Sequence, residues 1–367
     1  MFTFVKGNQF SVLLMTKEEI IDQFNPNAAA TADAGIYGLP FGAEHSDVVV
    51  VAVPWEVTVS SGSGTAEGPA AINEASMQVD LYNHDYPELW KKGIHLDLSF
   101  PQELQNKMMK AKDFAQEIIF AIEEGENISD NAVLSKKLNE VNDSCNQMNL
   151  WVKQQSELWL AKGKKAGLVG GDHSIPLGYI QLQGEKHSDF GILHIDAHMD
   201  LRNAYEGFTY SHASIFYNVL QTVPQVSSLV QVGIRDYCLQ EKEYAGNQGA
   251  RVNVYFDREI RKRIYSGENW NQLCLEMVER LPAKVYISVD IDGLDPKLCP
   301  NTGTPVPGGL EYEELVHLLN VLKQSGKEII GFDLCEVAPG DDSAGNGDWD
   351  GNVGARILYQ LCGTLAG

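Results

Sequence analysis

Short runs of β-branched and aliphatic residues alternate along this chain with longer stretches of helical periodicity, and this alternation strongly limits its fold. Several runs are almost continuously Val, Ile or Leu, as expected for strands that are covered on both faces. The alternation predicts βαβ units and a three-layer α/β/α fold around a central, mainly parallel sheet. The expected strands are 47–55, 166–171, 190–198, 229–235, 251–256, 285–292 and 328–336.

The rest of the chain predicts helices and an N-terminal arm. Helical periodicity is present over 103–124, 136–162, 312–325 and 351–365. The stretch 83–165 shows no convincing strand, so we expect a helical insertion there. Residues 1–46 contain Ala, Asn and Gly without strong periodicity, which indicates an arm that packs on the body or on a neighbouring subunit. Because no Pro- or Ser-rich linker and no repeat divides 47–367, we expect that range to form one domain.

Charge and cysteine content narrow the class of protein. The 367 residues include 28 Lys and Arg against 50 Asp and Glu, a formal charge of −22. Nucleic acids and anionic membrane surfaces are bound by clustered basic residues, so this balance argues against both and suits a cationic substrate. No apolar run reaches the ~18 residues of a membrane span. Six scattered cysteines without a C-x-x-C pair indicate reduced thiols and a cytoplasmic protein.

Side chains able to bind metal end three of the expected strands. The segments are Gly-Gly-Asp-His173, Asp196-Ala-His198-Met-Asp200 and Asp290-Ile-Asp292-Gly-Leu-Asp-Pro. In an open parallel sheet, ligands bind at the carboxyl ends of the strands. Because side chains alternate along a strand, we expect the three polar side chains of the second segment to point the same way, and likewise the first two carboxylates of the third.

Four carboxylates and two imidazoles in one crevice would repel one another unless a positive charge lay among them. A closed structural zinc site prefers four Cys or His ligands, whereas this mixture suits two divalent ions bridged by shared carboxylates. Alone, the first segment could be a turn with a capping Asp, and the third an N-cap and turn cluster. For the second segment a role without metal is disfavoured, because that role would bury three polar groups on one face of the strand. Together they predict a binuclear metal site.

With these motifs the chain resembles the ureohydrolases, the family of arginases, agmatinases, guanidinobutyrases and formimidoylglutamases, and in particular its agmatinase-like members. Further matching segments are Gly303-Thr304-Pro305-Val-Pro-Gly-Gly309, Gly331-Phe-Asp-Leu-Cys-Glu336-Val-Ala-Pro339 and Gly64-Thr65-Ala-Glu-Gly68-Pro69. The resemblance covers residue 47 to the C-terminus and weakens across 83–165. It implies an arginase-like fold, a homo-oligomer (trimer or hexamer), and hydrolysis of a guanidino or amidine C–N bond with release of urea.

Carried over position by position, the resemblance implies two Mn²⁺ ions per chain, with Ni²⁺, Co²⁺ or Zn²⁺ as alternatives. One ion would be bound by His173 and Asp200 and the other by His198 and Asp292, with Asp196 and Asp290 bridging them. Glu336 would bind the guanidinium, whose planar fork pairs well with a carboxylate; its simpler alternative is a strand-end ion pair or cap.

The resemblance assigns further roles around the metals. His212 would bind substrate and relay protons, although a lone loop histidine is more often solvated. Thr304 would contact the substrate, and Asp200 would help to pass a proton to the leaving amine. His194 shares the parity of the second metal-binding segment but lies deeper in its strand, which indicates a residue behind the ligands or a satisfied core histidine.

The sequence says less about the substrate's tail than about its guanidinium group. Arginases recognise the α-amino acid with a Ser-Gly-Asn-x-His-Gly type of loop, which the segment from Arg202 to His212 lacks. The resemblance therefore favours agmatine, then guanidine or a guanidino acid, then formimidoylglutamate. A long tail would be excluded by a pocket crowded by Tyr205, Phe208, Tyr210 or Trp349. A mononuclear zinc deacetylase and a non-catalytic relative are disfavoured because all six ligand positions are filled.

Overall fold

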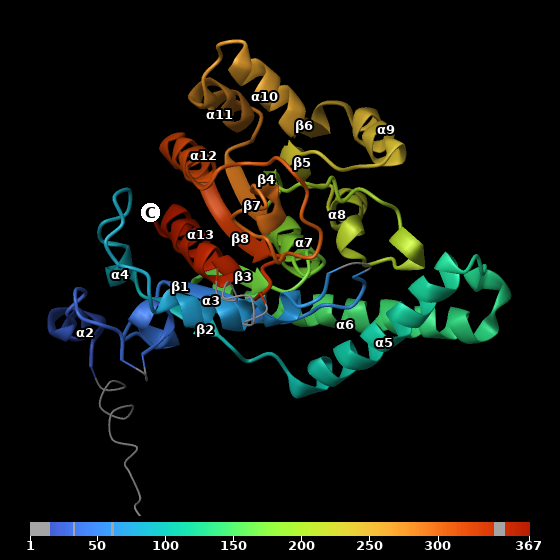
Figure 1. Ribbon diagram of the computed structural model, residues 1–367. Coiled ribbons are helices and arrows are strands. Elements are labelled where there is room, and N and C mark those ends of the chain that lie inside the picture. The colour runs from blue at the N-terminus through green and yellow to red at the C-terminus, as the bar shows by residue number, and fades with distance from the viewer. Residues whose placement is uncertain (1–14, 32–33, 60–61, 341–348) are drawn as a thin grey trace, which may run out of the picture.

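The computed structural model describes residues 15–31, 34–59, 62–340 and 349–367. At its centre the strands form one sheet in the order β2-β1-β3-β8-β7-β4-β5-β6, and every ladder between neighbours is parallel (Figure 1). The predicted α/β fold is therefore confirmed. The strands are β1 (Val48–Val53), β2 (Ile94–Asp97), β3 (Lys165–Gly170), β4 (Phe190–Ile195), β5 (Val226–Ile234), β6 (Val252–Phe256), β7 (Lys284–Asp290) and β8 (Glu328–Cys335).

Helices cover both faces of the sheet because successive strand side chains point to opposite sides. In β1, Val48 and Val50 pack into one buried cluster, whereas Val49 and Val51 pack into the other. The first cluster includes side chains of α2 (Lys17–Gln23), α3 (Gly68–Ser76), α4 (Leu89–Lys92), α10 (Asp257–Tyr265), α11 (Trp270–Glu279), α12 (Tyr312–Gln324) and α13 (Trp349–Ala366). The second includes side chains of α5 (Gln102–Glu123), α6 (Ala132–Ala161), α7 (Leu177–Lys186), α8 (Ile215–Thr222) and α9 (Leu239–Asn247).

The insertion 83–165 is mostly a hairpin of the long helices α5 and α6, which extends beyond the sheet (Figure 1). Helix α6 begins after Asn131, whose side chain accepts the N–H groups of Val133 and Leu134. The expectation that this stretch contains no strand is wrong, because β2 lies within it. β2 has only four residues and pairs with β1 alone, so pairing on an existing strand forms it rather than a periodicity of its own.

Of the expected arm, residues 1–14 and 32–33 lie outside the described part of the chain. A described part of the arm packs on the chain's own body through Tyr37. Its hydroxyl donates to the backbone oxygen of Ala355 at 2.8 Å, and its ring meets the edge of Tyr359 at a centroid distance of 4.8 Å. Among the described helices, none has the length and apolar character to cross a bilayer.

Candidate functional site

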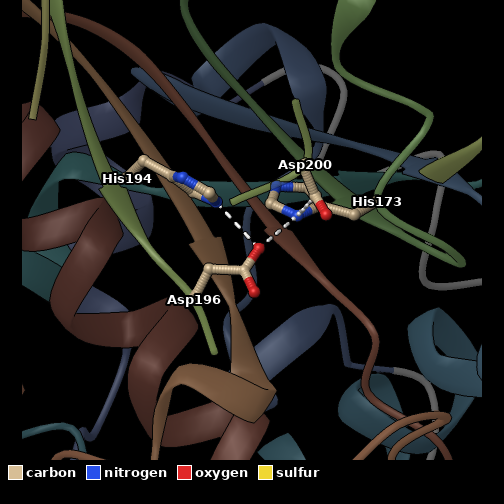
Figure 2. A group of neighbouring side chains, drawn as sticks. All are labelled: His173, His194, Asp196 and Asp200. Carbon is tan, nitrogen blue, oxygen red and sulfur yellow. Dashed lines mark hydrogen bonds and ion pairs between the residues drawn. The ribbon is translucent and has the colours of Figure 1, made fainter. Parts of the chain in front are cut away.

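Polar segments meet at the carboxyl ends of five neighbouring strands, β1, β3, β8, β7 and β4. This is the edge at which open α/β sheets bind ligands. Figure 2 shows His173, His194 and Asp200 arranged around Asp196, with all four side chains pointing toward one another. His173 follows β3, and Asp196 and Asp200 follow β4, so residues far apart in the chain come together as the sequence predicted.

The imidazole of His173 faces three carboxylates. Its Nδ1 lies 3.1 Å from Asp196 Oδ2 and 3.2 Å from Asp200 Oδ2. It also lies 3.4 Å from Asp290 Oδ2, at the end of β7. All four side chains are buried. Because little water reaches them, their charges interact more strongly than they would in solvent.

A second imidazole approaches Asp196 from its other oxygen. His198 Nδ1 lies 3.4 Å from Asp196 Oδ1 and 3.1 Å from Asp292 Oδ2. Because Oδ2 of the same carboxylate faces His173, Asp196 presents one oxygen to each histidine. A carboxylate shared in this way has the arrangement expected of a ligand that bridges two ions.

Among the described residues, His173, Asp333 and Cys335 form one compact group of possible ligand atoms, and two further groups share Asp196. One contains His173, His194, Asp196 and Asp200, and the other Asp196, His198 and Asp292; within each group the possible ligand atoms lie within 4.8 Å of one another. Carboxylate oxygen and imidazole nitrogen suit Mn²⁺, Ni²⁺, Co²⁺ and Zn²⁺. The residues therefore fit two divalent cations. Asp290, the other expected bridge, lies near His173 but outside both groups.

The chain reaches this arrangement by turns rather than by strand alternation. β4 ends at Ile195 and β7 at Asp290, so most of the cluster lies beyond the strands. The side chains do converge, but strand alternation is not the cause, and that part of the expectation is wrong. Asp200 and Glu336 adopt left-handed backbone conformations, with φ of 55° and 63°. Such strain costs about 1–3 kcal/mol per residue and persists where the surroundings enforce it, often at functional sites.

A glycine lets two of these turns approach each other. A Cβ atom on Gly293 would lie 2.7 Å from the backbone nitrogen of Asp196. The glycine after Asp292 in the third motif is therefore required by the close contact between the turns that follow β7 and β4.

Hydrogen bonds from behind orient the cluster. His194 Nε2 lies 2.8 Å from Asp196 Oδ2, and its Nδ1 lies 3.0 Å from the Gln231 amide nitrogen, so His194 lies behind the ligands as expected. His173 Nε2 lies 2.9 Å from Ser288 Oγ, which donates to Asp333 Oδ1 at 2.9 Å. Neither of these last two residues was singled out from the sequence, although Ser288 shares strand parity with Asp290. Partners of this kind fix ring orientation at metal sites.

The crowding of charge appears in the pKa values. Burial, followed by the Asp196 carboxylate, raises the pKa of Asp200 to about 7. Burial and then Asp292 raise the pKa of Asp290 well above its usual range. Burial opposes ionisation of Asp196 as well, but His194 and His173 outweigh it and bring its pKa well below the usual value. Without a cation, the site therefore retains protons on part of its acid cluster near neutral pH.

This proton balance predicts how metal affects stability. Asp200, Asp290 and Glu336 have raised pKa values in the folded state, so from about pH 4 to pH 7 the metal-free site holds protons that these groups release in the unfolded chain, and their contribution to stability falls as pH rises. At the same site His194 and His212, with lowered pKa values, act in the opposite direction, whereas the raised pKa values of His173 and His198 add to the loss of stability as pH rises above 6.5. Because cations replace those protons, we expect Mn²⁺ to raise the Tm more at pH 7.5 than at pH 5.5. Differential scanning fluorimetry, with NaCl of equal ionic strength as control, tests this; an equal gain at both pH values would contradict it.

Glu336 follows β8 and faces the same cluster. Its Oε1 accepts the backbone N–H of His173 at 2.8 Å, and its side chain is buried. Burial and then the Asp172 carboxylate raise the pKa of Glu336 well above its usual range. A cationic partner would relieve both effects, which fits the predicted guanidinium role.

His212 and Thr304 also line this region. His212 Nδ1 lies 3.4 Å from Thr58 Oγ1. Burial, with the charges of His198 and His173, lowers the pKa of His212 to about 4, so its imidazole is neutral near pH 7. Thr304 Oγ1 donates to Asp292 Oδ2 at 3.3 Å, which places it beside a predicted metal ligand.

These side chains border a cavity of about 160 Å³. It is lined by His173, His198, Asp200, Arg202, Tyr205, His212, Ala213, Asp236, Tyr237, Glu241, Asp290, Thr304 and Glu336. Of the aromatic residues expected to crowd it, Tyr205 is present, whereas Phe208, Tyr210 and Trp349 do not line it, which corrects that expectation. Phe208 is fully buried in the core, and Trp349 is exposed.

Comparison with known proteins agrees with this arrangement. A family model described as the arginase family matches residues 46–363. The N(1)-aminopropylagmatine ureohydrolase of Thermus thermophilus is 31% identical over 87% of this chain and 90% of its own length, and the mitochondrial agmatinase of Gallus gallus is 28% identical over 89% and 83%. The crystal structure of the agmatine ureohydrolase of Thermoplasma volcanium superposes with a TM-score of 0.65 at 21% identity, covering 95% of this chain and 97% of that one.

Proposed function

The chain belongs to the arginase family, whose members hydrolyse amidino C–N bonds of guanidino compounds, and we propose that its own substrate is a guanidino compound with an amine tail, of which agmatine is the simplest case. The observation that carries this proposal is that the two ligand groups sharing Asp196 contribute His173, Asp200 and His198 to the lining of a cavity that Glu336 also lines. Agmatine would yield putrescine and urea.

The proposed ligands of the two cations are His173 with Asp200 and His198 with Asp292, bridged by Asp196 and Asp290. When bound, the two cations supply the positive charge that lowers the pKa of water toward neutrality and so provides a hydroxide nucleophile. The rest of the reaction is assigned to side chains of the chain itself.

Glu336 orients the substrate, because its carboxylate pairs with the guanidinium fork and fixes the central carbon. His212 borders the same cavity and its imidazole is neutral near pH 7, and we assign it the relay of protons between the site and the solvent. Asp200 lines the cavity as well, and we assign it the transfer of a proton from the attacking water to the leaving amine. The products are urea and the amine.

The charges that line the cavity support an amine tail. Away from the metal ligands and Glu336, its lining includes two carboxylates, Asp236 and Glu241, and one guanidinium, Arg202. Arg202 is already engaged, since its Nε lies 3.6 Å from Glu241 Oε2 and its guanidinium carbon lies 4.5 Å from the ring centre of Tyr205. Among the described residues, no ion pair involves Asp236, whose carboxylate is exposed. Asp236 therefore keeps a negative charge at the cavity that favours an ammonium group.

We expect Asp236→Asn to raise the KM for agmatine about two- to fivefold and to leave the kinetics of guanidine unchanged. An exposed ion pair is worth about 1 kcal/mol or less, and free guanidine has no tail to lose it. Steady-state urea release with both substrates measures the difference. An equal change for both would show that Asp236 does not recognise the tail.

A guanidino acid is the second candidate, favoured by Arg202, which could pair with a carboxylate tail if it left Glu241.

The experiment that tests the function is urea and ammonia release from agmatine, arginine, guanidinobutyrate, formimidoylglutamate and guanidine, after reconstitution with Mn²⁺ and separately with Ni²⁺. Agmatine is expected to give the highest kcat/KM. A higher value for guanidinobutyrate or guanidine would replace the amine-tail proposal and keep the family chemistry.

A further inference from the structure

Two loops that bring Thr58 and His212 together are attached to the same helical hairpin, α5–α6. The first loop follows β1 and ends at the short helix η3 (Thr65–Glu67). The second follows Asp200 and leads into the short helix η6 (His212–Ser214). Thr58 Oγ1 and His212 Nδ1 lie 3.4 Å apart, so the two loops meet at the proposed proton relay.

The described parts of the first loop, 54–59 and 62–64, contain a buried carboxylate that a lysine of α5 neutralises. Glu56 is 1% exposed and accepts the N–H groups of Gly64 and Thr65 at 2.7 and 2.6 Å and the Ser63 hydroxyl at 2.6 Å. Lys112 forms an ion pair with Glu56 and donates to Ser63 Oγ at 2.7 Å. A buried carboxylate without a cation is strongly unfavourable, so this loop conformation depends on α5.

The second loop is held by α6. Asn142 Oδ1 accepts the N–H of Thr209 at 2.8 Å, and its Nδ2 donates to the oxygen of Gly207 at 3.4 Å. Ala204 and Glu206 in this loop have φ of 50° and 54°. Residues other than glycine keep a left-handed backbone conformation only where their surroundings enforce it. The hydrogen bonds of Asn142 supply part of that constraint.

We propose that the α5–α6 hairpin sets the position of His212 through these two loops, with Glu56, Lys112 and Asn142 as positioning residues. The inference rests on the proposed function, since it takes His212 as the proton relay. Misplacing a reacting group by about 1 Å can cost up to about a hundredfold in rate. Loss of either attachment should therefore act on kcat rather than on substrate binding.

The test compares Lys112→Met and Asn142→Ala with matched controls on the same helices. Lys110→Met removes a lysine of α5 that pairs with the partly exposed Glu140, and Ser144→Ala removes a hydroxyl of α6 that donates to its own helix. We expect kcat for agmatine to fall about tenfold in the first two variants, with KM within about twofold, and neither to change in the controls. Lys112→Arg, which keeps the charge, should retain at least about half of the activity.

The decisive comparison repeats both substitutions in a His212→Asn background. If they act by placing His212, they should cause no further loss once it is absent. The same tenfold loss in both backgrounds would indicate a merely structural role and overturn the inference.

A readout independent of activity separates this inference from the proposed function. We expect amide hydrogen exchange in 62–66 to be faster in Lys112→Met and exchange in 203–211 to be faster in Asn142→Ala, with the controls unchanged. If the unsubstituted protein releases no urea from any guanidino compound, the proposed function fails. If exchange in these loops is unchanged in the variants, the hairpin does not position them.

Discussion

The Asp196→Asn variant is expected to lose at least about a thousandfold in kcat and to bind fewer than two divalent cations per chain. Asp196 presents one oxygen toward His173 and the other toward His198, so the substitution removes a negative charge from the centre of both ligand groups. Metal charge stabilises the transition state by several kcal/mol, and each ~1.4 kcal/mol is a factor of ten in rate. Urea release and inductively coupled plasma mass spectrometry measure the two effects.

The matched control is Asp189→Asn. Asp189 is exposed and lies just before β4, whereas Asp196 lies just after it, so the same chemical change is made at the two ends of one strand. The control should keep full activity and metal content. An Asp196→Asn protein that retains two cations and activity within tenfold would show that this carboxylate does not bridge the ions.

The second large effect is expected at Glu336. Glu336→Gln should lower kcat/KM for agmatine by about a hundred- to a thousandfold while leaving the metal content at two per chain. Truncating one partner of a buried charge pair costs about 2–5 kcal/mol, and Gln keeps the size of the side chain and an oxygen to accept the N–H of His173. Steady-state kinetics with parallel metal analysis tests this.

Glu328→Gln is its control, because Glu328 is the exposed first residue of β8 and Glu336 follows the end of the same strand. Loss of metal in Glu336→Gln would assign the residue to the metal site instead. Unchanged kcat/KM would remove it from substrate binding.

The central strands and the turns that follow them could be predicted from the sequence because each strand is a continuous apolar run that ends in polar residues. The runs 47–55, 285–292 and 328–336 correspond to β1 (Val48–Val53), β7 (Lys284–Asp290) and β8 (Glu328–Cys335). Parallel strands share one carboxyl edge, so the polar residues after them had to meet there. The convergence of His173 and Asp196 follows from this rule without any side-chain detail.

The exact ends of the strands could not be predicted from the same pattern. Asp200 and Glu336 have left-handed φ values that no alternation rule predicts, and they depend on tertiary contacts around the turns. β2 was missed because four residues are too few to show a period. Phe208 was expected to crowd the cavity, but its ring is buried in the core.

Residues that support the site from a distance are invisible in the sequence for a different reason. Lys112 and Asn142 each lie among other polar residues of a long amphipathic helix, where a polar residue ordinarily faces solvent. Their partners, Glu56 and Thr209, are 56 and 67 residues away along the chain. Only the path of the α5–α6 hairpin beside the sheet brings these pairs together.

Counting the cations in reconstituted protein is the most direct measurement. After loading with Mn²⁺ and removal of the free metal, the active protein should contain two ions per chain, and chelation should abolish urea release until metal is restored. A fully active protein with one ion or fewer per chain would contradict the proposal that the shared Asp196 carboxylate bridges two cations.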